Sequence, residues 1–367
     1  MDPLFEPAIE RLREAISTST FPIPDPLPID RWLAASLLQK AIRRGEADVA
    51  VQAAVTLLNS PMASLWRRLV IIAFEDLGAG SVDLIIQAVV VHQDREIRNS
   101  LGPELLVGVT LTRLMANAAK ERSADYTICA AKAHPYLEAF RGHCGSRSLG
   151  DRLALVTDMN LTLPERELAA WYASGIEWGD EKRLGKGNLP GLMEAFDSLQ
   201  IPRSLINATH VAAKATREPI VIMVPLIWHA IQQAGDGRVR HNPVPDSPFV
   251  NGVPVYGFDK HTRLGQQAIW RFARENRDVH DVLEQFVPEL RHRDAVLMAC
   301  YYADAAPISN QLAWSCSDRL EKMGTQNDLL KAGVPFDGGC QLVDVVCENL
   351  RHLNEIRSGL FEVSNLR

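Results

Sequence analysis

The densest group of chemically active side chains in this sequence lies at the end of a long loop. The consecutive residues there are Asp259, Lys260, His261, Thr262 and Arg263. A carboxylate can position or activate a water molecule, and an imidazole can exchange a proton near neutral pH. Loops held by a rigid scaffold are favoured places for functional sites. We therefore interpret Asp259 and His261 as the candidate catalytic residues.

Neighbouring residues have types that could hold a substrate. The Thr262 hydroxyl and the backbone amides at the start of the next helix could bind an anionic phosphate. Trp270 offers a flat face for stacking, and nearby arginines extend a positive stripe. The predicted substrate-binding residues are Tyr256, Lys260, Thr262, Arg263 and Trp270. A structural interpretation stands beside this one, because Asp259 or Thr262 could simply cap the next helix.

Signature motifs of several other enzyme classes do not occur in the sequence. It has no G-x-x-x-x-G-K-[ST] P-loop, no G-x-S-x-G elbow, no H-E-x-x-H and no G-x-G-x-x-G. The six cysteines are scattered, without the C-x-x-C pairs typical of zinc sites, so we expect reduced thiols. We predict no cofactor and no metal, which leaves metal-free hydrolysis.

Three further acidic residues have structural interpretations beside a possible catalytic one. Asp304 lies in the run YYADAAP, where a buried acidic role is conceivable and the two tyrosines could line a pocket or merely pack. Glu75 and Asp76 follow Arg68, and residues seven apart can share one helical face. Buried carboxylates need partners, so we expect these charges to pair with each other or to hold a neighbouring helix.

Composition limits the protein classes that need to be considered. The chain has 367 residues, of which 47% are hydrophobic and 23% charged, and its formal net charge is -6. That charge argues against a protein coated in basic residues but permits a local positive face. The predicted DNA-binding residues on such a face are Arg43, Arg44, Lys186, Arg271 and Arg274.

Hydrophobic periodicity predicts helices along most of the chain. Asp30 can cap the first long helix and Gly45 can end it, and the next helix closes at Asn59-Ser60-Pro61. Glycine-rich loops at 179–191 and 235–257 interrupt the second half. The predicted fold is mainly α, with a helical bundle or array in the N-terminal half and a loop-rich, mostly helical C-terminal half.

These patterns predict three segments. Residues 1–29 form a short helix and a proline-rich extended segment, residues 30–141 a helical domain, and residues 142–367 a loop-rich helical domain that carries the candidate site. The first residues lack the basic end and apolar run of a signal peptide. The longest apolar stretch, 220–231, falls short of the roughly 20 residues that a bilayer requires. We expect a cytoplasmic protein with no membrane partner.

Three runs in the first third carry a resemblance to a known family. They are SLLQKAIRRGEADVAVQAAVTLLNSP, LWRRLVIIAFEDLGAGSVDL and GPELLVGVTLTRLMANAAKERSADYTICAA. Over residues 32–134 the chain resembles the C-terminal region of RarA/MgsA-type AAA+ ATPases, relatives of clamp loaders. The resemblance implies helical collar and oligomerisation elements, and a homo-oligomer or a replication protein as partner. Because the chain contains no P-loop, we expect no ATP-driven remodelling by it alone.

These features together predict a function in DNA metabolism. Cleavage of a base from its sugar suits the side chains available, because a carboxylate can stabilise positive charge on the sugar while a pocket grips the extruded base. We predict a metal- and ATP-independent DNA glycosylase-type hydrolase that excises a modified base, in repair or in defence against phage DNA. The alternative is a non-catalytic, clamp-loader-collar-like oligomerisation or adaptor protein at replication forks. An enzyme acting on a small molecule is a third hypothesis.

Overall fold

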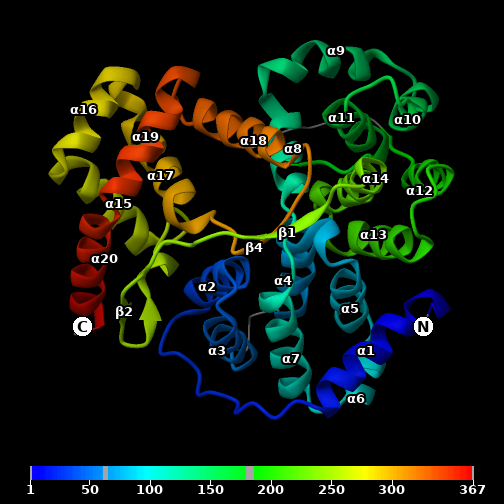
Figure 1. Ribbon diagram of the computed structural model, residues 1–367, viewed down its shortest axis with the longest axis horizontal. Helices are drawn as coiled ribbons and strands as arrows, with labels where there is room; N and C mark the ends of the chain where they lie inside the picture. The colour runs from blue at the N-terminus through cyan, green and yellow to red at the C-terminus, as the bar shows by residue number, and fades with distance from the viewer. Residues whose placement is uncertain (1, 61–64, 179–185, 366–367) are drawn as a thin grey trace. The chain divides into compact units, whose positions relative to one another are not determined.

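The computed structural model describes residues 2–60, 65–178 and 186–365 (Figure 1). Within these ranges the protein is mainly α, with 20 α-helices and 73% helical residues. Its strands are few and form two small two-stranded sheets. The predicted fold class is therefore confirmed. No helix in the described part of the chain is long and apolar enough to cross a membrane.

Contacts divide the chain into two compact units, each assembled from separate stretches of sequence. Unit 1 contains residues 1–23, 64–241 and 310–324, and unit 2 contains residues 24–63, 242–309 and 325–367. This division differs from the predicted boundary at residue 141. Residues 142–241 belong with 64–141, whereas 30–63 belong with the C-terminal half.

Unit 1 is a helical array in which α5 and α11 lie deep. Helix α5 packs against α1, α4 and α13, and every residue of α11 from Pro164 to Ser174 except Glu165 is buried. The helices of unit 1 are α1 (Glu6–Ser17), α4 (Leu65–Ile72), α5 (Val82–Gln93), α6 (Arg95–Leu101), α7 (Glu104–Asn117), α8 (Ser123–Ala133), α9 (Glu138–Ser146), α10 (Leu149–Thr157), α11 (Leu163–Ser174), α12 (Leu189–Ser198), α13 (Arg203–Thr216) and α14 (Val224–Ala234). Strands β1 (Arg238–His241) and β4 (Asn310–Ala313) pair antiparallel beside them, with Arg238 opposite Ala313.

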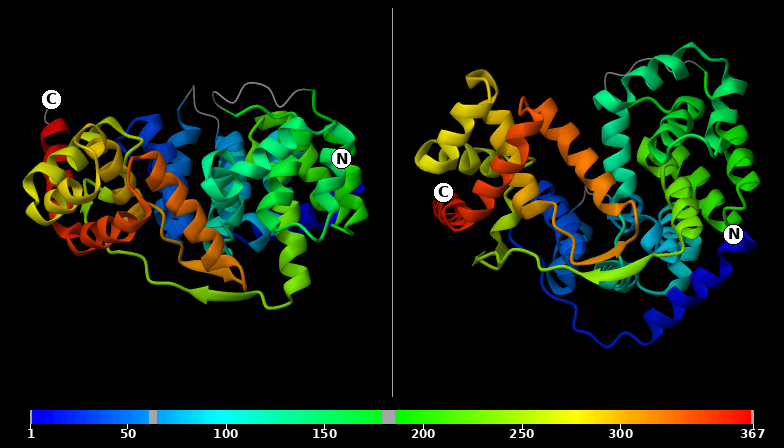
Figure 2. Two further views of the ribbon diagram at one scale, coloured as in Figure 1. Left: turned by 90° about the horizontal axis from the view of Figure 1, so that it is seen from above. Right: turned by 45° about the horizontal axis from the view of Figure 1, so that its top comes forward.

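Unit 2 begins with a helical hairpin and continues with a cluster of helices. Its helices are α2 (Arg31–Arg44), α3 (Ala47–Leu58), α15 (Arg263–Glu275), α16 (Arg277–Phe286), α17 (His292–Cys300), α19 (Phe336–Glu348) and α20 (Leu350–Asn365). Helix α18 (Ser317–Lys331) contains the boundary between the units at residue 324. Helix α15 packs against α16, α17 and α20, and both views of Figure 2 show the yellow and red helices side by side.

Two of the predicted helix ends are confirmed. The Asp30 carboxylate accepts hydrogen bonds from the backbone amides of Trp32 and Leu33, and Gly45 ends α2 in the left-handed conformation with φ of 76°. Helices α8 and α9 are separate elements, because Pro135 starts a 3-10 turn between them. The predicted loop 235–257 contains a β-hairpin.

That hairpin follows from its turn residues. Strands β2 (Phe249–Val250) and β3 (Val253–Pro254) are joined by Asn251 and Gly252, whose φ angles are 52° and 78°. Two positive φ angles in sequence favour an Asn-Gly pair and match the right-handed twist of the flanking strands.

Candidate functional site

The loop that carries the predicted catalytic residues is held by its own backbone and by the start of α15. Thr262 accepts a hydrogen bond from the Gly265 amide at 3.1 Å and donates one to the Asp259 carbonyl at 3.1 Å. Asp259 Oδ1 accepts from the His261 amide at 3.0 Å. A Cβ at Gly265 would lie 2.1 Å from the Asp259 carbonyl oxygen, so only glycine allows this close approach.

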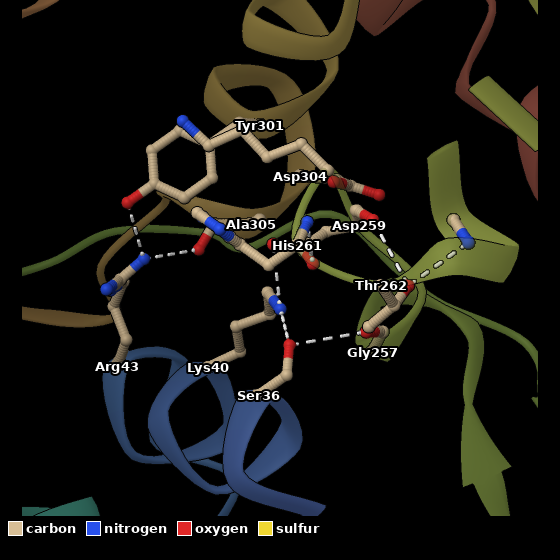
Figure 3. A network of polar contacts seen from close by, with 12 residues as sticks. Ser36, Lys40, Arg43, Gly257, Asp259, His261, Thr262, Tyr301, Asp304 and Ala305 are labelled. Carbon is tan, nitrogen blue, oxygen red and sulfur yellow. Dashed lines mark hydrogen bonds and ion pairs between the residues drawn. The ribbon is translucent and has the colours of Figure 1, made fainter. Parts of the chain in front are cut away.

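A buried ion pair ties this loop to α2 (Figure 3). Lys40 Nζ lies 2.9 Å from Asp259 Oδ2, and the side chains are 4% and 1% exposed. Lys40 also donates to the Ser36 hydroxyl, which in turn donates to the Gly257 carbonyl at 3.4 Å. Burial lowers the pKa of Lys40 against the opposing pull of Asp259. Burial would raise the pKa of Asp259, but the Lys40 charge and hydrogen bonds outweigh it and hold that pKa below its ordinary value.

A second buried pair lies in a π-helical turn after α17. The turn spans Tyr301–Ala305, and its Asp304 carboxylate pairs with Arg357 of α20, whose side chain is buried. Carbonyl groups of the same turn accept hydrogen bonds from α2: Ala305 from Arg43 at 2.8 Å and Asp304 from Arg44 at 3.0 Å. Single π-helical turns are frequent at functional sites because they redirect backbone groups. Here the turn joins α2, α17 and α20.

A cavity of about 840 Å³ opens beside this network, and we call it the Trp32 pocket. Its apolar walls include Leu33, Phe258, Leu360 and Phe361. Trp32 is 67% exposed, an unusual position for so large an apolar side chain, and the Arg31 guanidinium lies 4.8 Å from its ring centroid. The polar lining residues are Asp30, His261, Thr262, Arg263 and Gln267. Its volume and mixed lining are typical of ligand sites.

A second, smaller cavity of about 300 Å³ shares His261 as a lining residue, and we call it the Lys260 cleft. It is lined by Lys260, His261, Arg291, Asp294, Met298 and Lys331, among others. Neighbouring protein atoms shield part of the His261 ring, although the side chain as a whole is exposed, and this partial burial lowers its pKa. Asp259 opposes the effect and Lys260 adds to it. The imidazole is therefore mainly neutral at pH 7 and faces both cavities.

The structure places the predicted site residues at different depths. Asp259 is interior, whereas His261 and Arg263 are exposed. Tyr256 is buried, with its hydroxyl donating to Glu46, and Trp270 packs against the helical core. Of the predicted set, His261, Thr262 and Arg263 line the Trp32 pocket, and Lys260 and His261 line the Lys260 cleft.

The predicted DNA-binding arginines of α2 require a correction. Arg43 and Arg44 are only 2% and 3% exposed, and both guanidinium groups bind carbonyl oxygens of the protein itself. They stabilise the interior of unit 2 and do not form a solvent-facing basic surface. Lys186, Arg271 and Arg274 are exposed, and Arg271 pairs with Glu275 at 2.7 Å.

Three residues that the structure brings to this site carry no functional signal in the sequence pattern. Lys40 falls on the apolar stripe of its helix, three residues after Leu37, and a lysine there signals a buried, paired cation. Asp30 was interpreted only as a cap, although it also lines the pocket. Trp32 lies beside the apolar stripe, and nothing in the sequence pattern marks its exposure.

The acidic residues of the first third form a separate buried network in unit 1. Arg122 Nε lies 3.1 Å from Asp76, and its Nη2 lies 3.4 Å from Glu75 and also contacts Asp125. Glu75 and Asp76 belong to another π-helical turn, Ala73–Leu77, after α4. Their pairing with the start of α8 supports the structural interpretation.

Comparison with known proteins yields no match. No protein-family model matches the chain, and neither a curated protein nor a solved structure does. The resemblance of residues 32–134 to RarA/MgsA-type ATPases therefore stays a prediction. Within the described ranges, no group of three or more His, Cys, Asp and Glu side chains is arranged to hold a metal ion.

Proposed function

We propose that unit 2 binds DNA and receives an unstacked base in the Trp32 pocket. The observation that carries this proposal is an exposed tryptophan at the wall of a ligand-sized cavity, with a guanidinium against its ring. Aromatic side chains bind bases by stacking, which contributes roughly 1–3 kcal/mol per base and tolerates any sequence. Arg31 and the exposed Arg263 supply positive charge for the phosphates on either side of such a base.

The lining of the pocket suits a base better than a charged metabolite. Phe258, Phe361 and Leu33 provide apolar surface, and Gln267 provides an amide that can donate to and accept from a base edge. A base enters such a pocket only when it has left the stack, so single-stranded or locally opened DNA is the preferred form.

Trp32→Ala tests this proposal in a binding titration with a fluorescently labelled single-stranded oligonucleotide. We expect the dissociation constant to rise about tenfold, which corresponds to about 1.4 kcal/mol for one lost stacking contact. Phe249→Ala is the matched control, because Phe249 is an exposed aromatic residue of unit 2 outside the pocket lining, and it should leave affinity unchanged. Equal affinities of the wild type and Trp32→Ala would contradict the proposal.

Excision of the bound base is the catalytic form of the same proposal. Water would bond to C1′ of the sugar as the C1′–N bond breaks, and the base would leave with a proton from that water. Asp259 lies too deep for this step, because its carboxylate faces Lys40. Among the described lining residues of the Trp32 pocket, Asp30 is the one carboxylate, and His261 also lines it.

The excision step is tested by alkali-labile strand breaks in a panel of natural and modified DNAs, without ATP or metal. Asp30→Asn should abolish breaks and keep the helix cap, because asparagine caps as well as aspartate. Asp259→Asn should instead act through stability, because it disturbs the buried pair with Lys40. Intact DNA across the whole panel would exclude excision and leave the binding proposal to the titration.

The adaptor function suggested by the resemblance is the alternative proposal. It requires a stable homo-oligomer or a replication partner that the chain binds through residues 32–134. Asp30→Asn, which lies outside that range and keeps the helix cap, should then leave that association unchanged. A monomer that binds single-stranded DNA through Trp32 would count against it.

A further inference from the structure

The Trp32 pocket is larger than the base that the proposed function brings into it. Its volume of about 840 Å³ lies in the upper part of the range, roughly 300–1,000 Å³, in which cavities bury most of a drug-sized ligand. A single base is much smaller than such a ligand, and a base stacked on Trp32 covers only one wall. The remaining volume therefore has room for a substituent that extends from the base.

The polar side chains of the pocket come mainly from the start of α15 and the loop before it. Arg263 and Gln267 are four residues apart in α15, so they lie on the same face of the helix, and both side chains are exposed. His261 comes from the preceding loop and also lines the pocket. The apolar residues Leu33 and Leu360 come from α2 and α20. A ligand in the pocket thus meets polar groups mainly where α15 begins.

These polar groups are available to a ligand. Within the described part of the chain, neither the Arg263 guanidinium nor the Gln267 amide forms a hydrogen bond or an ion pair with another protein group. The His261 ring packs edge-on against the Tyr301 ring, and its nitrogens have no hydrogen-bond partner among the described residues. Donors and acceptors that are free in this way can bind a ligand whose own polar groups match them.

The charge of the lining indicates what kind of substituent fits. Among the described lining residues, Asp30 and Arg263 carry opposite charges, and His261 is mainly neutral at pH 7. The lining therefore has no net charge that would favour an anionic or a cationic substituent. The Gln267 amide and the neutral imidazole each donate and accept hydrogen bonds, as hydroxyl groups do. A neutral substituent with several hydroxyl groups matches this set.

We propose that the base received by the Trp32 pocket carries a neutral substituent with several hydroxyl groups, such as a hexose. The inference rests on the proposed function for the base, whereas the substituent follows from the volume of the pocket and its free polar groups. The 5-position of a pyrimidine suits such a substituent, because that atom is on the major-groove edge of the base and not on the edge that pairs. A group attached there can enter the pocket ahead of the base while the backbone stays at its mouth.

A binding titration with three single-stranded oligonucleotides tests this inference. They differ in one central base, which is cytosine, 5-hydroxymethylcytosine or 5-hydroxymethylcytosine that carries glucose on its hydroxyl group. We expect the glucosylated base to bind at least about tenfold more tightly than cytosine, because it fills more of the pocket and satisfies its polar groups. The hydroxymethylated base should bind like cytosine, because it fills little of the volume.

Two variants test the volume and the polar groups separately. Leu264→Trp changes a half-buried pocket residue, reduces the room in the pocket and should remove the advantage of the glucosylated base. Gln267→Met keeps the length of the side chain without its amide and should reduce that advantage about threefold or more. Leu290→Trp is the matched control, because Leu290 is 96% exposed and lines neither cavity, and it should leave all three affinities unchanged.

The outcomes distinguish this inference from the proposed function. Equal affinity for the three oligonucleotides, with all three weakened in Trp32→Ala, would overturn the substituent and leave the base pocket standing. Affinities that Trp32→Ala leaves unchanged would contradict the proposed function and this inference together. If the glucosylated base keeps its advantage in both Leu264→Trp and Gln267→Met, the sugar is bound elsewhere and the inference is wrong. Loss of the advantage in these two variants, but not in Leu290→Trp, supports it.

Discussion

Each of the two units contains a π-helical turn with a buried aspartate paired to a buried arginine. In unit 1 the turn Ala73–Leu77 carries Asp76, which faces Arg122. In unit 2 the turn Tyr301–Ala305 carries Asp304, which faces Arg357. Both turns follow the last residue of an α-helix, and each is closed by a hydrogen bond from an amide five residues further along the chain.

The surroundings of the two pairs differ. Glu75 and Asp125 also contact Arg122, and the preceding residue in the chain, Glu121, is buried as well. Ionisable side chains therefore surround the pair in unit 1. Arg357 is on α20, within one turn of Leu360 and Phe361, which line the Trp32 pocket. A buried charge pair is therefore not by itself the sign of a functional site. Its significance depends on whether the helices that it holds also form the wall of a cavity.

Removal of either arginine should produce the largest effect. Arg122→Met and Arg357→Met each leave a buried carboxylate without its cation, which costs about 3–5 kcal/mol of unfolding free energy. We expect Arg122→Met to be the more damaging, because three carboxylates lose their partner. Urea denaturation followed by circular dichroism measures the loss.

The same two variants distinguish the two regions by ligand binding. At a temperature where both variants remain folded, Arg357→Met should weaken oligonucleotide binding because α20 loses its anchor, and Arg122→Met should not. Equal loss of affinity in both variants would show that the two pairs do not differ in the way proposed.

Glu121, one of the buried acids of unit 1, should make the stability of the protein depend on pH. Burial raises the pKa of Glu121 to about 7, although hydrogen bonds from Ser123 oppose this. Because the folded pKa exceeds the unfolded one, the contribution of Glu121 is fully present below about pH 4.5 and is lost as pH rises through about 7. The rise of the Glu121 pKa from 4.5 to about 7 corresponds to a loss of about 3 kcal/mol in the free energy of unfolding. Denaturation at intervals from pH 5 to 7.5 should show this decline.

Glu121→Gln provides the control, because glutamine can still accept the hydrogen bonds from Ser123. It should make the decline of stability with pH shallower, and the decline that remains comes from other buried acids such as Glu167, whose pKa burial also raises. Lys120 does not interfere in this window, since burial lowers its pKa to about 8 and its contribution therefore changes only at higher pH. If the stability of Glu121→Gln falls with pH as steeply as that of the wild type, the pH dependence comes from another group.

The smallest effect is expected at the surface of unit 2. Arg271→Gln breaks a half-exposed pair with Glu275, and such pairs contribute about 0.5 kcal/mol or less. The same variant should leave binding of thymidine unchanged because Arg271 lines neither cavity. If Arg271→Gln lowers the free energy of unfolding by more than about 1 kcal/mol in urea, exposed ion pairs contribute more to the stability of this unit than expected from their exposure.

Local features of the fold were predictable from sequence, and long-range ones were not. Capping by Asp30 and termination at Gly45 depend on residues within one or two turns, so the pattern of α2 identifies them. The Asn251-Gly252 hairpin was equally local and was still overlooked, because its strands are only two residues long. The units are assembled from separated stretches, a property that composition along the chain cannot reveal.

The candidate site shows the same limit. The run from Asp259 to Arg263 stood out because polar residues gather there, and the structure confirms that Thr262 caps α15. The burial of Asp259 could not be predicted, because it depends on an ion pair with Lys40, which is far away in the sequence. Its charge likewise led to the prediction that Arg43 binds DNA. In the structure the Arg43 guanidinium is buried and donates a hydrogen bond to the carbonyl group of Ala305, which is distant in sequence.

A π-helical turn holds one residue more than the α-helical turn that it replaces. Loss of a single residue between Tyr301 and Ala305 would therefore restore a regular helix, in which each residue advances the side-chain direction by about 100°. Such a deletion would rotate the residues that follow it relative to α17, and Asp304 would turn away from Arg357. In sequences that share this segment, its length is thus a more sensitive record of the site than the identity of most residues within it.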